Sequence, residues 1–180
     1  RRARGEDRGR VTPPDEAPDA RSIGHEHTLA QDCYDREQLE ALLLELAGRV
    51  GRRARRHHLG GRRVVLKLRD RRFNTITHGR VLPEPVDADG DLFATGRDLL
   101  AETQFWSRGV RLLGLSLQQL VHLDQVRQLA FDFVTRPHRA LPVLDEVRAK
   151  YGPASLEPAR VLQAPRARRC RPRDRWPGRP

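Results

Sequence analysis

Four histidines and one cysteine are the first residues of this sequence whose types and spacing suggest chemistry. His25 and His27 are one residue apart, so on a β-strand their imidazole rings lie on one face and can chelate a metal ion. Cys33 follows them, and His57 and His58 form a second pair. No carboxylate or cysteine accompanies the histidines at the spacing of a helical metal site, and the second pair lies in the most cationic segment, which repels a divalent cation. We therefore expect surface or phosphate-facing histidines rather than a metal site.

Catalytic motifs are absent from the sequence. It contains no HExxH helix, no nucleophile elbow, no Walker A loop and no GxGxxG fingerprint. Gly60-Gly61 is interpreted as the end of a helix, not as a phosphate-binding loop. Asp15, Glu16 and Asp19 lie in a proline-rich segment with no predicted strand to orient them. The sequence thus predicts no catalytic residue, no metal ligand and no cofactor on this chain.

Positive charge is concentrated in one segment. The 180 residues carry a formal net charge of +11, and residues 49–72, with ten arginines and Lys67 against Asp70, account for +10 of it. Such a cluster attracts polyanions, and arginine forks bind phosphate oxygens in a bidentate manner. Phe73 is the aromatic residue nearest to the cluster, so the sequence favours binding to duplex phosphates over stacking on single-stranded bases. The alternative is a solvated charged surface without a ligand.

Hydrophobic periodicity predicts the elements that carry this charge. Residues 22–29 alternate as a strand, with Ile23, His25, His27 and Leu29 on one face. A helix is predicted over 36–58, capped by Asp35, with Gln38 completing a capping box and Gly60-Gly61 ending the helix. The apolar stripe of this helix consists of Leu39, Leu42, Leu43, Leu46 and Val50.

Two further strands are predicted at 62–69 and 74–82, and the short connection between them indicates a hairpin. The second of these strands is expected to end at Pro83-Glu84-Pro85. The outer face of the first carries three cations and one valine: Arg63, Val65, Lys67 and Arg69. We expect this strand and the end of the preceding helix to contribute to one basic surface.

A second helix is predicted over 90–105, with Leu92, Phe93, Leu99 and Leu100 on its buried side, and a fourth strand over 109–118. The order β-α-β-β-α-β predicts an α+β fold, in which two helices cover one face of a four-stranded antiparallel-type sheet. The other face is then free for solvent or ligand. This unit spans 22–120.

The flanking segments differ in composition from this unit. Residues 1–21 are interpreted as a linker or arm, 121–137 as a tail, 138–152 as a short helix ended by Gly152, and 153–180 as a disordered basic tail. No stretch approaches the roughly 18 apolar residues of a membrane-spanning helix. Because the sequence lacks methionine altogether, we expect a fragment or a processed product.

Four segments resemble, in order, the strands of one known domain. They are Ser22-Ile-Gly-His-Glu-His-Thr28, Val64-Val-Leu-Lys-Leu-Arg69, Thr75-Ile-Thr-His-Gly-Arg-Val-Leu-Pro83 and Val110-Arg-Leu-Leu-Gly-Leu-Ser116. They are similar to the little-finger domain of Y-family translesion DNA polymerases of the bacterial polymerase IV type. The resemblance covers about 11–152, and Val11-Thr-Pro-Pro-Asp-Glu16 looks like the link from the preceding thumb domain. It implies a sheet that lies in the DNA major groove and holds the backbone of primer–template DNA.

The resemblance also implies which residues contact DNA. They are Gly24 and His25 on the first strand, Thr77, His78 and Arg80 on the third, and Arg111 and Ser116 on the fourth. His78 departs from the family pattern, where arginine is common, and a neutral histidine weakens a phosphate contact. Lys67 and Arg69 are added because they share the basic outer face of their strand.

A sliding clamp is the second partner that the resemblance implies. Gln128, Leu129, Phe131 and Phe133 look like the six-residue form of the clamp-binding peptide of the family, with phenylalanine where leucine is usual at the third of these positions. A glutamine and two large apolar side chains on a tail can fill a small pocket. The alternative is that both phenylalanines fold back onto the domain.

The polymerase chemistry of the family uses palm carboxylates that hold two magnesium ions, and we expect no such palm within these 180 residues. We therefore expect this chain to bind DNA without synthesising it, and to be a monomeric domain with no membrane partner. The parent protein is expected to be a bacterial, cytoplasmic, nucleoid-associated DNA polymerase of error-prone lesion bypass. One alternative is a free-standing regulatory module that binds RNA or DNA. Another is an inactive truncated product.

Overall fold

The computed structural model describes residues 21–123 and 140–159. Most of the predicted arm, the clamp-binding peptide and much of the predicted basic tail lie outside these residues. The described elements are β1 (Ser22–Cys33), α1 (Arg36–Arg56), β2 (Leu59–Asp70), β3 (Thr75–Val86), α2 (Asp89–Thr103), the 3-10 helix η2 (Phe105–Arg108), β4 (Val110–His122) and α4 (Ala140–Tyr151). The predicted β-α-β-β-α-β order is confirmed, with η2 inserted before the last strand.

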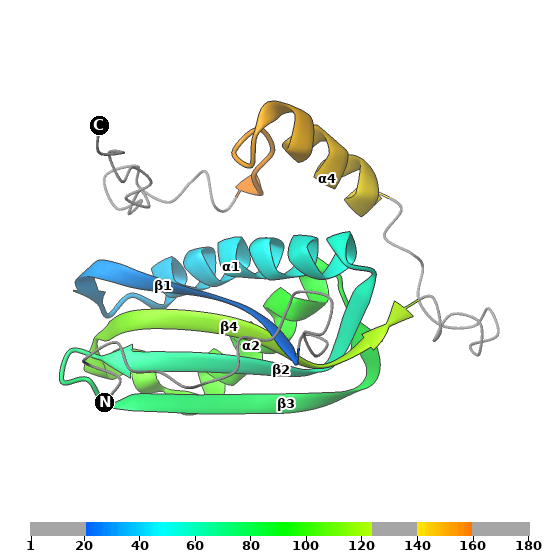
Figure 1. Cartoon of the computed structure of the whole chain (residues 1–180). Coiled ribbons are helices and arrows are strands. Elements are labelled where there is room, and N and C mark those ends of the chain that lie inside the picture. Colours follow the sequence, from blue (N-terminus) through cyan, green and yellow to red (C-terminus); the bar gives the residue numbers. More distant parts are fainter. Residues whose placement is uncertain (1–20, 124–139, 160–180) are drawn as a thin grey trace, which may run out of the picture.

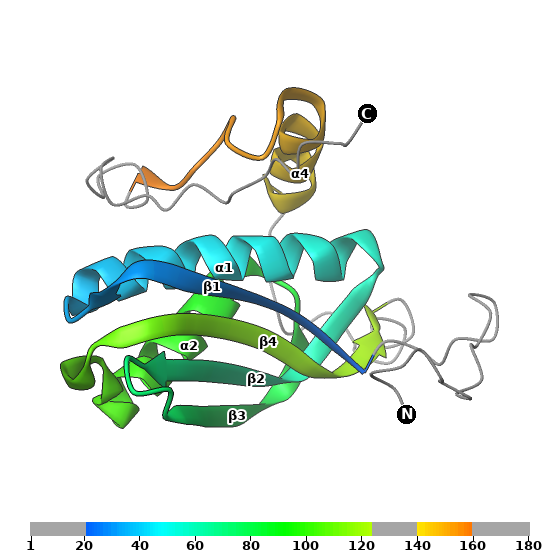
Figure 2. The same cartoon turned by 60° about the vertical axis from the view of Figure 1, so that its left-hand side comes forward.

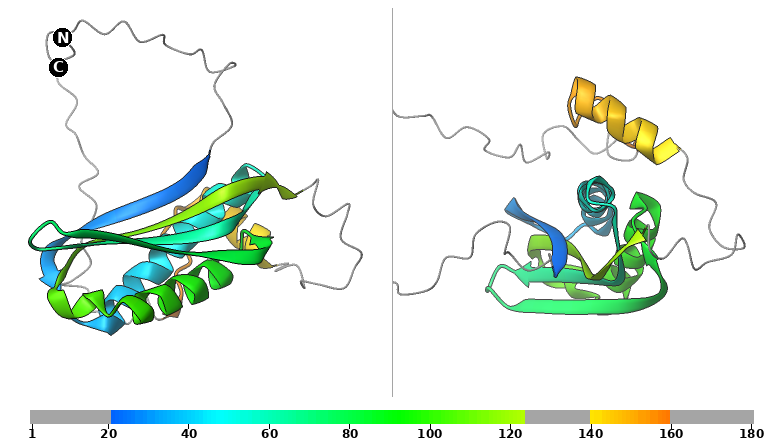
Figure 3. Two further views of the ribbon diagram at one scale, coloured as in Figure 1. Left: turned by 90° about the horizontal axis from the view of Figure 1, so that it is seen from below. Right: turned by 45° about the vertical axis from the view of Figure 1, so that its right-hand side comes forward.

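The four strands form one antiparallel sheet in the order β1-β4-β2-β3. Helices α1 and α2 lie on the same face of it, as the predicted α+β class requires (Figure 1; Figure 3, left). The core fills the space between these helices and the sheet. Its fully buried side chains come from alternate strand positions and from the apolar helix stripes: Leu39, Leu43, Leu46, Val50, Leu66, Leu68, Leu92, Leu99, Leu100, Leu113, Leu115 and Leu117.

The N-terminus of α1 is capped as the sequence predicts, but the capping box takes another form. The Asp35 Oδ1 atom accepts a hydrogen bond of 2.9 Å from the backbone nitrogen of Glu37. The Gln38 side chain donates to the second carboxylate oxygen, Asp35 Oδ2, at 2.6 Å. An aspartate cap offers two acceptor oxygens, so it engages both partners by itself.

The expectation that Gly60-Gly61 ends this helix is wrong. Helix α1 ends at Arg56, His58 adopts the left-handed turn conformation with φ of 55°, and both glycines are buried residues of β2. A Cβ atom on Gly60 would lie 2.6 Å from Leu123 Cδ2, and one on Gly61 would lie 2.4 Å from Leu117 Cγ. The glycines are therefore needed for close packing against Leu117 of β4 and Leu123 just after it, not for a turn.

The expected end of the third strand at Pro83-Glu84-Pro85 is also wrong, because β3 continues to Val86. Strand β3 pairs with β2 on one side and lies at the edge of the sheet. An edge strand tolerates proline, since the missing N–H groups need not bond to a second neighbour.

The predicted β2–β3 hairpin is confirmed. Asp70 stabilises its turn by accepting hydrogen bonds from Asn74 Nδ2 (2.8 Å), Asn74 N (2.9 Å) and Arg72 N (2.8 Å). These bonds, led by that of the Asn74 side chain, lower the pKa of Asp70.

The predicted C-terminal helix is present as α4, and Gly152 follows it with φ of 95°. It lies over α1, on the far side of that helix from the sheet (Figures 1, 2 and 3). No residue of this helix is buried, and ion pairs connect it to the domain. Arg55 of α1 forms ion pairs with Asp145 of α4 at 2.7 Å and with Asp89 of α2 at 2.8 Å.

Within residues 21–123 and 140–159, no helix has the length and apolar character needed to cross a membrane.

Candidate nucleic-acid interface

The face of the sheet opposite α1 and α2, here called the open face, is covered by none of the described helices (Figure 3, left). Strand pairing arranges sixteen of its residues in four rows that cross the sheet from β1 through β4 and β2 to β3. The rows are Ser22, Gln118, Arg63 and Val81; Gly24, Ser116, Val65 and Gly79; Glu26, Gly114, Lys67 and Thr77; and Thr28, Leu112, Arg69 and Thr75. Since consecutive rows are two residues apart along each strand, they are separated by about 7 Å.

The second row consists of small side chains. A Cβ atom on Gly24 would lie 2.9 Å from Ser116 Cβ, and one on Gly79 would lie 3.1 Å from Val65 Cγ2. The row therefore leaves a shallow depression across the sheet, whose lining includes Gly24, Val65 and Ser116 together with the neighbouring Lys67 and Gln118. Such a depression admits a polymer backbone close to the strands.

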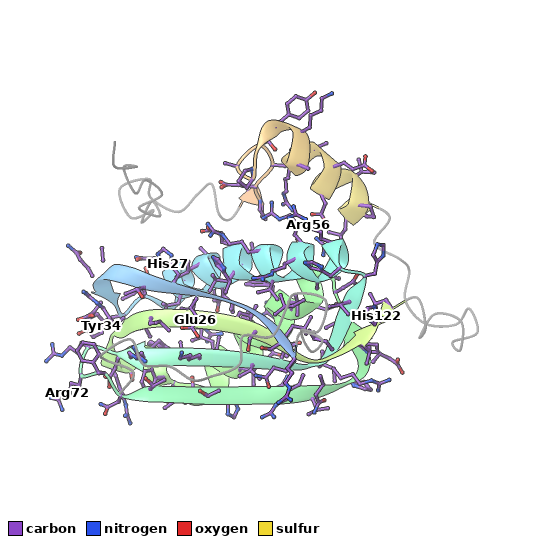
Figure 4. The ribbon with its side chains drawn as sticks, in the orientation of Figure 1. Glu26, His27, Tyr34, Arg56, Arg72 and His122 are labelled. Atoms are coloured by element: carbon purple, nitrogen blue, oxygen red, sulfur yellow. The ribbon has the colours of Figure 1, made fainter. Side chains whose placement is uncertain are left out.

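Two cations of β2, Arg63 and Lys67, flank the second row, and a third, Arg69, lies one row beyond Lys67. Arg63 lies against Gly79, with its Nε atom 3.3 Å from the position of a Cβ atom there. Lys67 Nζ donates to both carboxylate oxygens of Glu26, at 2.8 and 3.1 Å, and Arg69 Nε donates to Thr75 Oγ1 at 2.8 Å. Glu26 is the one acidic residue of the sixteen, so the open face carries a net charge of about +2. Exposed Arg71 and Arg72 continue the positive charge at the β2–β3 turn, and Figure 4 labels Arg72 there.

Five of the nine predicted DNA contacts lie together on the open face. They are Gly24, Lys67, Arg69, Thr77 and Ser116. Arg63 lies on the same face, as the alternation along its strand predicts, but it is not among the predicted contacts, and neither are Glu26 and the glycines of β3 and β4. Strict alternation along each strand is the signal that identifies them, because residues two apart share a face.

Three of the other predicted contacts lie on the helix side of the sheet. His25 Nε2 is 2.9 Å from Arg49 Nη1 of α1, and burial, followed by the charge of this arginine, lowers the pKa of His25. His78 and Arg80 of β3 face α2, where both pair with Glu102 and the arginine also pairs with Asp98 at 3.4 Å. The sheet thus separates these residues from the open face.

Arg111, the last predicted contact on the strands, lies where β4 begins. Its Nη1 atom donates to the Ala30 carbonyl oxygen at 3.0 Å and is 3.7 Å from Asp32 Oδ1. The pairing of β4 with both neighbours shifts register close to this point. The clamp-binding peptide predicted at Gln128, Leu129, Phe131 and Phe133 lies outside the described residues.

The expectation of one basic surface formed by the helix end and the following strand is wrong. The five arginines of residues 49–56 belong to α1 and lie on the helix side of the sheet, whereas Arg63, Lys67 and Arg69 lie on the open face. Helix α1 packs against the sheet through its apolar stripe, so its polar side points away from the open face.

His25 and His27 do share a strand face, as predicted, but the described residues contain no group of three or more histidines, cysteines or carboxylates arranged to hold a metal ion.

Known proteins resemble this chain at the level of sequence. The model of the impB/mucB/samB family C-terminal domain matches residues 20–131. A DNA polymerase IV of Moorella thermoacetica is 38% identical over 132 residues, which cover 73% of this chain and 33% of that relative. The chain spans between 33% and 41% of the length of the first three curated relatives that it matches.

Solved structures resemble it as well. A Y-family DNA polymerase chimera has a TM-score of 0.52 at 17% identity, over 62% of this chain and 32% of its own, and this similarity shows the fold. A little finger domain of a polymerase IV, solved in complex with a beta-clamp processivity factor, has a TM-score of 0.48 at 28% identity, over 64% of this chain and 98% of its own.

Proposed function

The chain belongs to the impB/mucB/samB family through its C-terminal domain, the little-finger domain of Y-family DNA polymerases, and from this membership we propose that its open face binds the backbone of duplex DNA. The arrangement of the sixteen open-face residues is the observation that carries the proposal. Arg63 and Lys67 lie on either side of a row of small side chains and Arg69 lies one row beyond Lys67, so a phosphate chain can approach the sheet between cations.

A duplex is favoured over a single strand because the sixteen positions include no aromatic residue. Proteins that bind single strands stack bases on exposed aromatic rings, whereas duplex backbones are held by cations and small polar groups. Ser22, Thr77 and Ser116 supply hydroxyl groups near the cations of β2. We expect binding that depends on phosphates and little on base sequence.

We further propose that this domain serves lesion bypass by an error-prone DNA polymerase of the bacterial polymerase IV type. The curated relatives bear that name, and the chain spans a third to two fifths of their length. Polymerisation would then use palm carboxylates and two magnesium ions outside the matched segment. The role of the domain in such an enzyme is to hold primer–template DNA.

Recruitment by a sliding clamp is a separate part of the proposal. It rests on Gln128, Leu129, Phe131 and Phe133, which follow β4 as the clamp-binding peptide of the family follows its last strand. A 180-residue chain with Phe131 and Phe133 both changed to alanine is expected to lose clamp binding, measured by surface plasmon resonance, and to keep its affinity for DNA. Equal clamp binding by both proteins would refute this part.

The alternative is a free-standing nucleic-acid-binding regulator with the same fold. The coding sequence upstream of Arg1 distinguishes the two. An open reading frame that continues into a palm with paired acidic residues supports the polymerase, and a start codon close to Arg1 supports the regulator.

DNA binding itself is tested with the purified chain and a fluorescein-labelled duplex in anisotropy titrations between 50 and 200 mM salt. Each neutralised phosphate contributes about −0.9 to the slope of log K against log salt concentration, so a slope of about −3 or steeper is expected for three or more contacts. Duplexes of unrelated sequence are expected to bind with similar affinity. A slope near zero, or no binding at 50 mM salt, would refute the proposal.

A further inference from the structure

The open face contains one acidic residue, Glu26, and its position suggests a role of its own. We propose that Glu26 competes with DNA phosphate for Lys67 and thereby sets the affinity and the salt dependence of DNA binding, an inference that rests on the proposed function of the open face. The Glu26 carboxylate accepts two hydrogen bonds from Lys67 Nζ, at 2.8 and 3.1 Å. It therefore holds the lysine as a phosphate group would.

Gly114 makes this contact possible. Glu26 lies on β1 and Lys67 on β2, two strands apart, and both pair with Gly114 on the intervening β4. Neighbouring strands are about 4.8 Å apart, so the two side chains together span about 10 Å across the sheet. A Cβ atom on residue 114 would lie 2.8 Å from Glu26 Cγ, so the glutamate side chain occupies the space that any larger residue there would fill. The pair thus crosses the open face above β4; Figure 4 labels Glu26.

Solvent exposure keeps the pair open to exchange. The Glu26 side chain is 47% exposed and that of Lys67 is 33% exposed, so water screens their attraction. A phosphate approaching the row of small side chains can reach the ammonium group without disturbing the core. To gain this contact the DNA phosphate must compete with the carboxylate for the N–H groups of the lysine and must lie beside its negative charge. Glu26 therefore weakens binding twice, by occupying the lysine and by repelling phosphate.

The opposite role for Glu26 is a direct contact to DNA. A glutamate in the major groove can accept a hydrogen bond from the amino group of cytosine. This role predicts that removing the carboxylate weakens binding or relaxes a preference for cytosine. The competition that we propose predicts the reverse, tighter binding to every sequence. The two roles therefore differ in the sign of one measured change.

The variant Glu26→Gln keeps the size of the side chain and removes its charge. We expect it to bind duplex DNA about three- to tenfold more tightly than the parent chain at 50 mM salt, since one charge pair on the surface is at stake. Its slope of log K against log salt concentration should be steeper by about 0.9, because Lys67 then neutralises one more phosphate. Glu146→Gln on exposed α4 makes the same change in net charge far from the open face and should alter affinity less than twofold.

A double-mutant cycle with Lys67→Gln locates the effect. If Glu26 acts by occupying Lys67, most of the gain from Glu26→Gln should disappear when the lysine is already absent. Unchanged circular dichroism and thermal melting would show that all four proteins are folded. A parent chain that binds DNA while Glu26→Gln binds equally or more weakly would overturn the inference and leave the proposed function intact. A folded parent chain that binds no duplex would overturn both.

Discussion

The two faces of the sheet both carry cations, but they differ in how those cations are paired. On the helix side, Arg55 pairs with Asp89 and Asp145, and Arg80 pairs with Asp98 and Glu102. On the open face, Glu26 pairs with Lys67, and Arg69 donates to the hydroxyl group of Thr75. The difference teaches that the density of arginine along the sequence does not define a polyanion-binding surface. We expect it to be defined by the face of the sheet on which each cation lies.

The largest expected effect separates stability from binding at two consecutive residues of β4. Leu115 is fully buried on the helix side, and Ser116 lies on the open face. Leu115→Ala should lower the free energy of unfolding by about 2–5 kcal/mol, because it leaves a cavity in the core. Ser116→Ala should lower it by less than about 1 kcal/mol. Urea denaturation followed by circular dichroism measures both, and similar losses in the two variants would contradict the assignment of the faces.

Removing the three cations of the open face is expected to have the next largest effect. The triple variant Arg63→Gln, Lys67→Gln and Arg69→Gln should weaken duplex binding roughly a hundredfold at 100 mM salt. It should reduce the salt slope by about 1.8, because the phosphate contacts of Arg63 and Arg69 are lost while Lys67 is already held by Glu26 in the parent chain. Anisotropy titrations with a labelled duplex measure both quantities.

The matched control for this triple variant changes three arginines on the helix side. Arg53, Arg56 and Arg97 are exposed residues of α1 and α2, and changing all three to glutamine alters net charge equally. It should weaken binding less than about threefold, through long-range charge alone. Equal losses in the two triple variants would show that net charge, and not the open face, governs binding.

A smaller effect compares two arginines of the same hairpin. Arg69 on β2 points to the open face, whereas Arg80 on β3 pairs with the acidic residues of α2. Arg69→Gln should weaken duplex binding about fivefold to tenfold, and Arg80→Gln less than about twofold, in the same anisotropy assay. A larger loss for Arg80→Gln would mean that DNA displaces Glu102 and that the contact implied by family resemblance is real.

The faces of the strands could be predicted from sequence only where the pattern is local. Alternation along β2 places Lys67 and Arg69 together because it depends on nothing outside the strand. The position of Arg80 opposite Val64 depends on strand pairing, and its ion pairs depend on where α2 crosses the sheet. Family resemblance transfers such residues by position in a motif, and it carries no information about which carboxylate faces them here.

The same reasoning explains the misinterpreted glycines and prolines. Gly60-Gly61 has the composition of a helix end, but the side chains that require glycine there, Leu117 and Leu123, are more than 50 residues away in the sequence. Pro83 and Pro85 have the composition of a strand end, but β3 tolerates them because it lies at the edge of the sheet. Element order was predictable from periodicity, whereas these residues depend on tertiary neighbours.

The smallest expected effect concerns His25, which family resemblance places at the DNA and the structure places beside Arg49. Its pKa is lowered from the usual 6.5 by burial and by that arginine. The unfolded chain therefore takes up the proton at higher pH than the folded one, so stability that is fully present above pH 6.5 is lost as the pH falls through 6.5 towards the folded pKa. His25→Gln removes this loss, and the difference in Tm between pH 7.5 and pH 5.5 should shrink by about 1–2 °C, a small change because His25 is only partly buried.

The DNA affinity of His25→Gln tests whether DNA contacts this histidine. At pH 7.5 the histidine is neutral and lies behind the sheet, so His25→Gln should bind duplex within about twofold of the parent chain, measured by anisotropy at 50 mM salt. A tenfold loss at pH 7.5 would mean that DNA reaches the helix side of β1, and the contrast between the two faces would then fail at this residue. A loss that appears only at pH 5.5 would instead indicate that protonated His25 leaves Arg49 and turns towards phosphate.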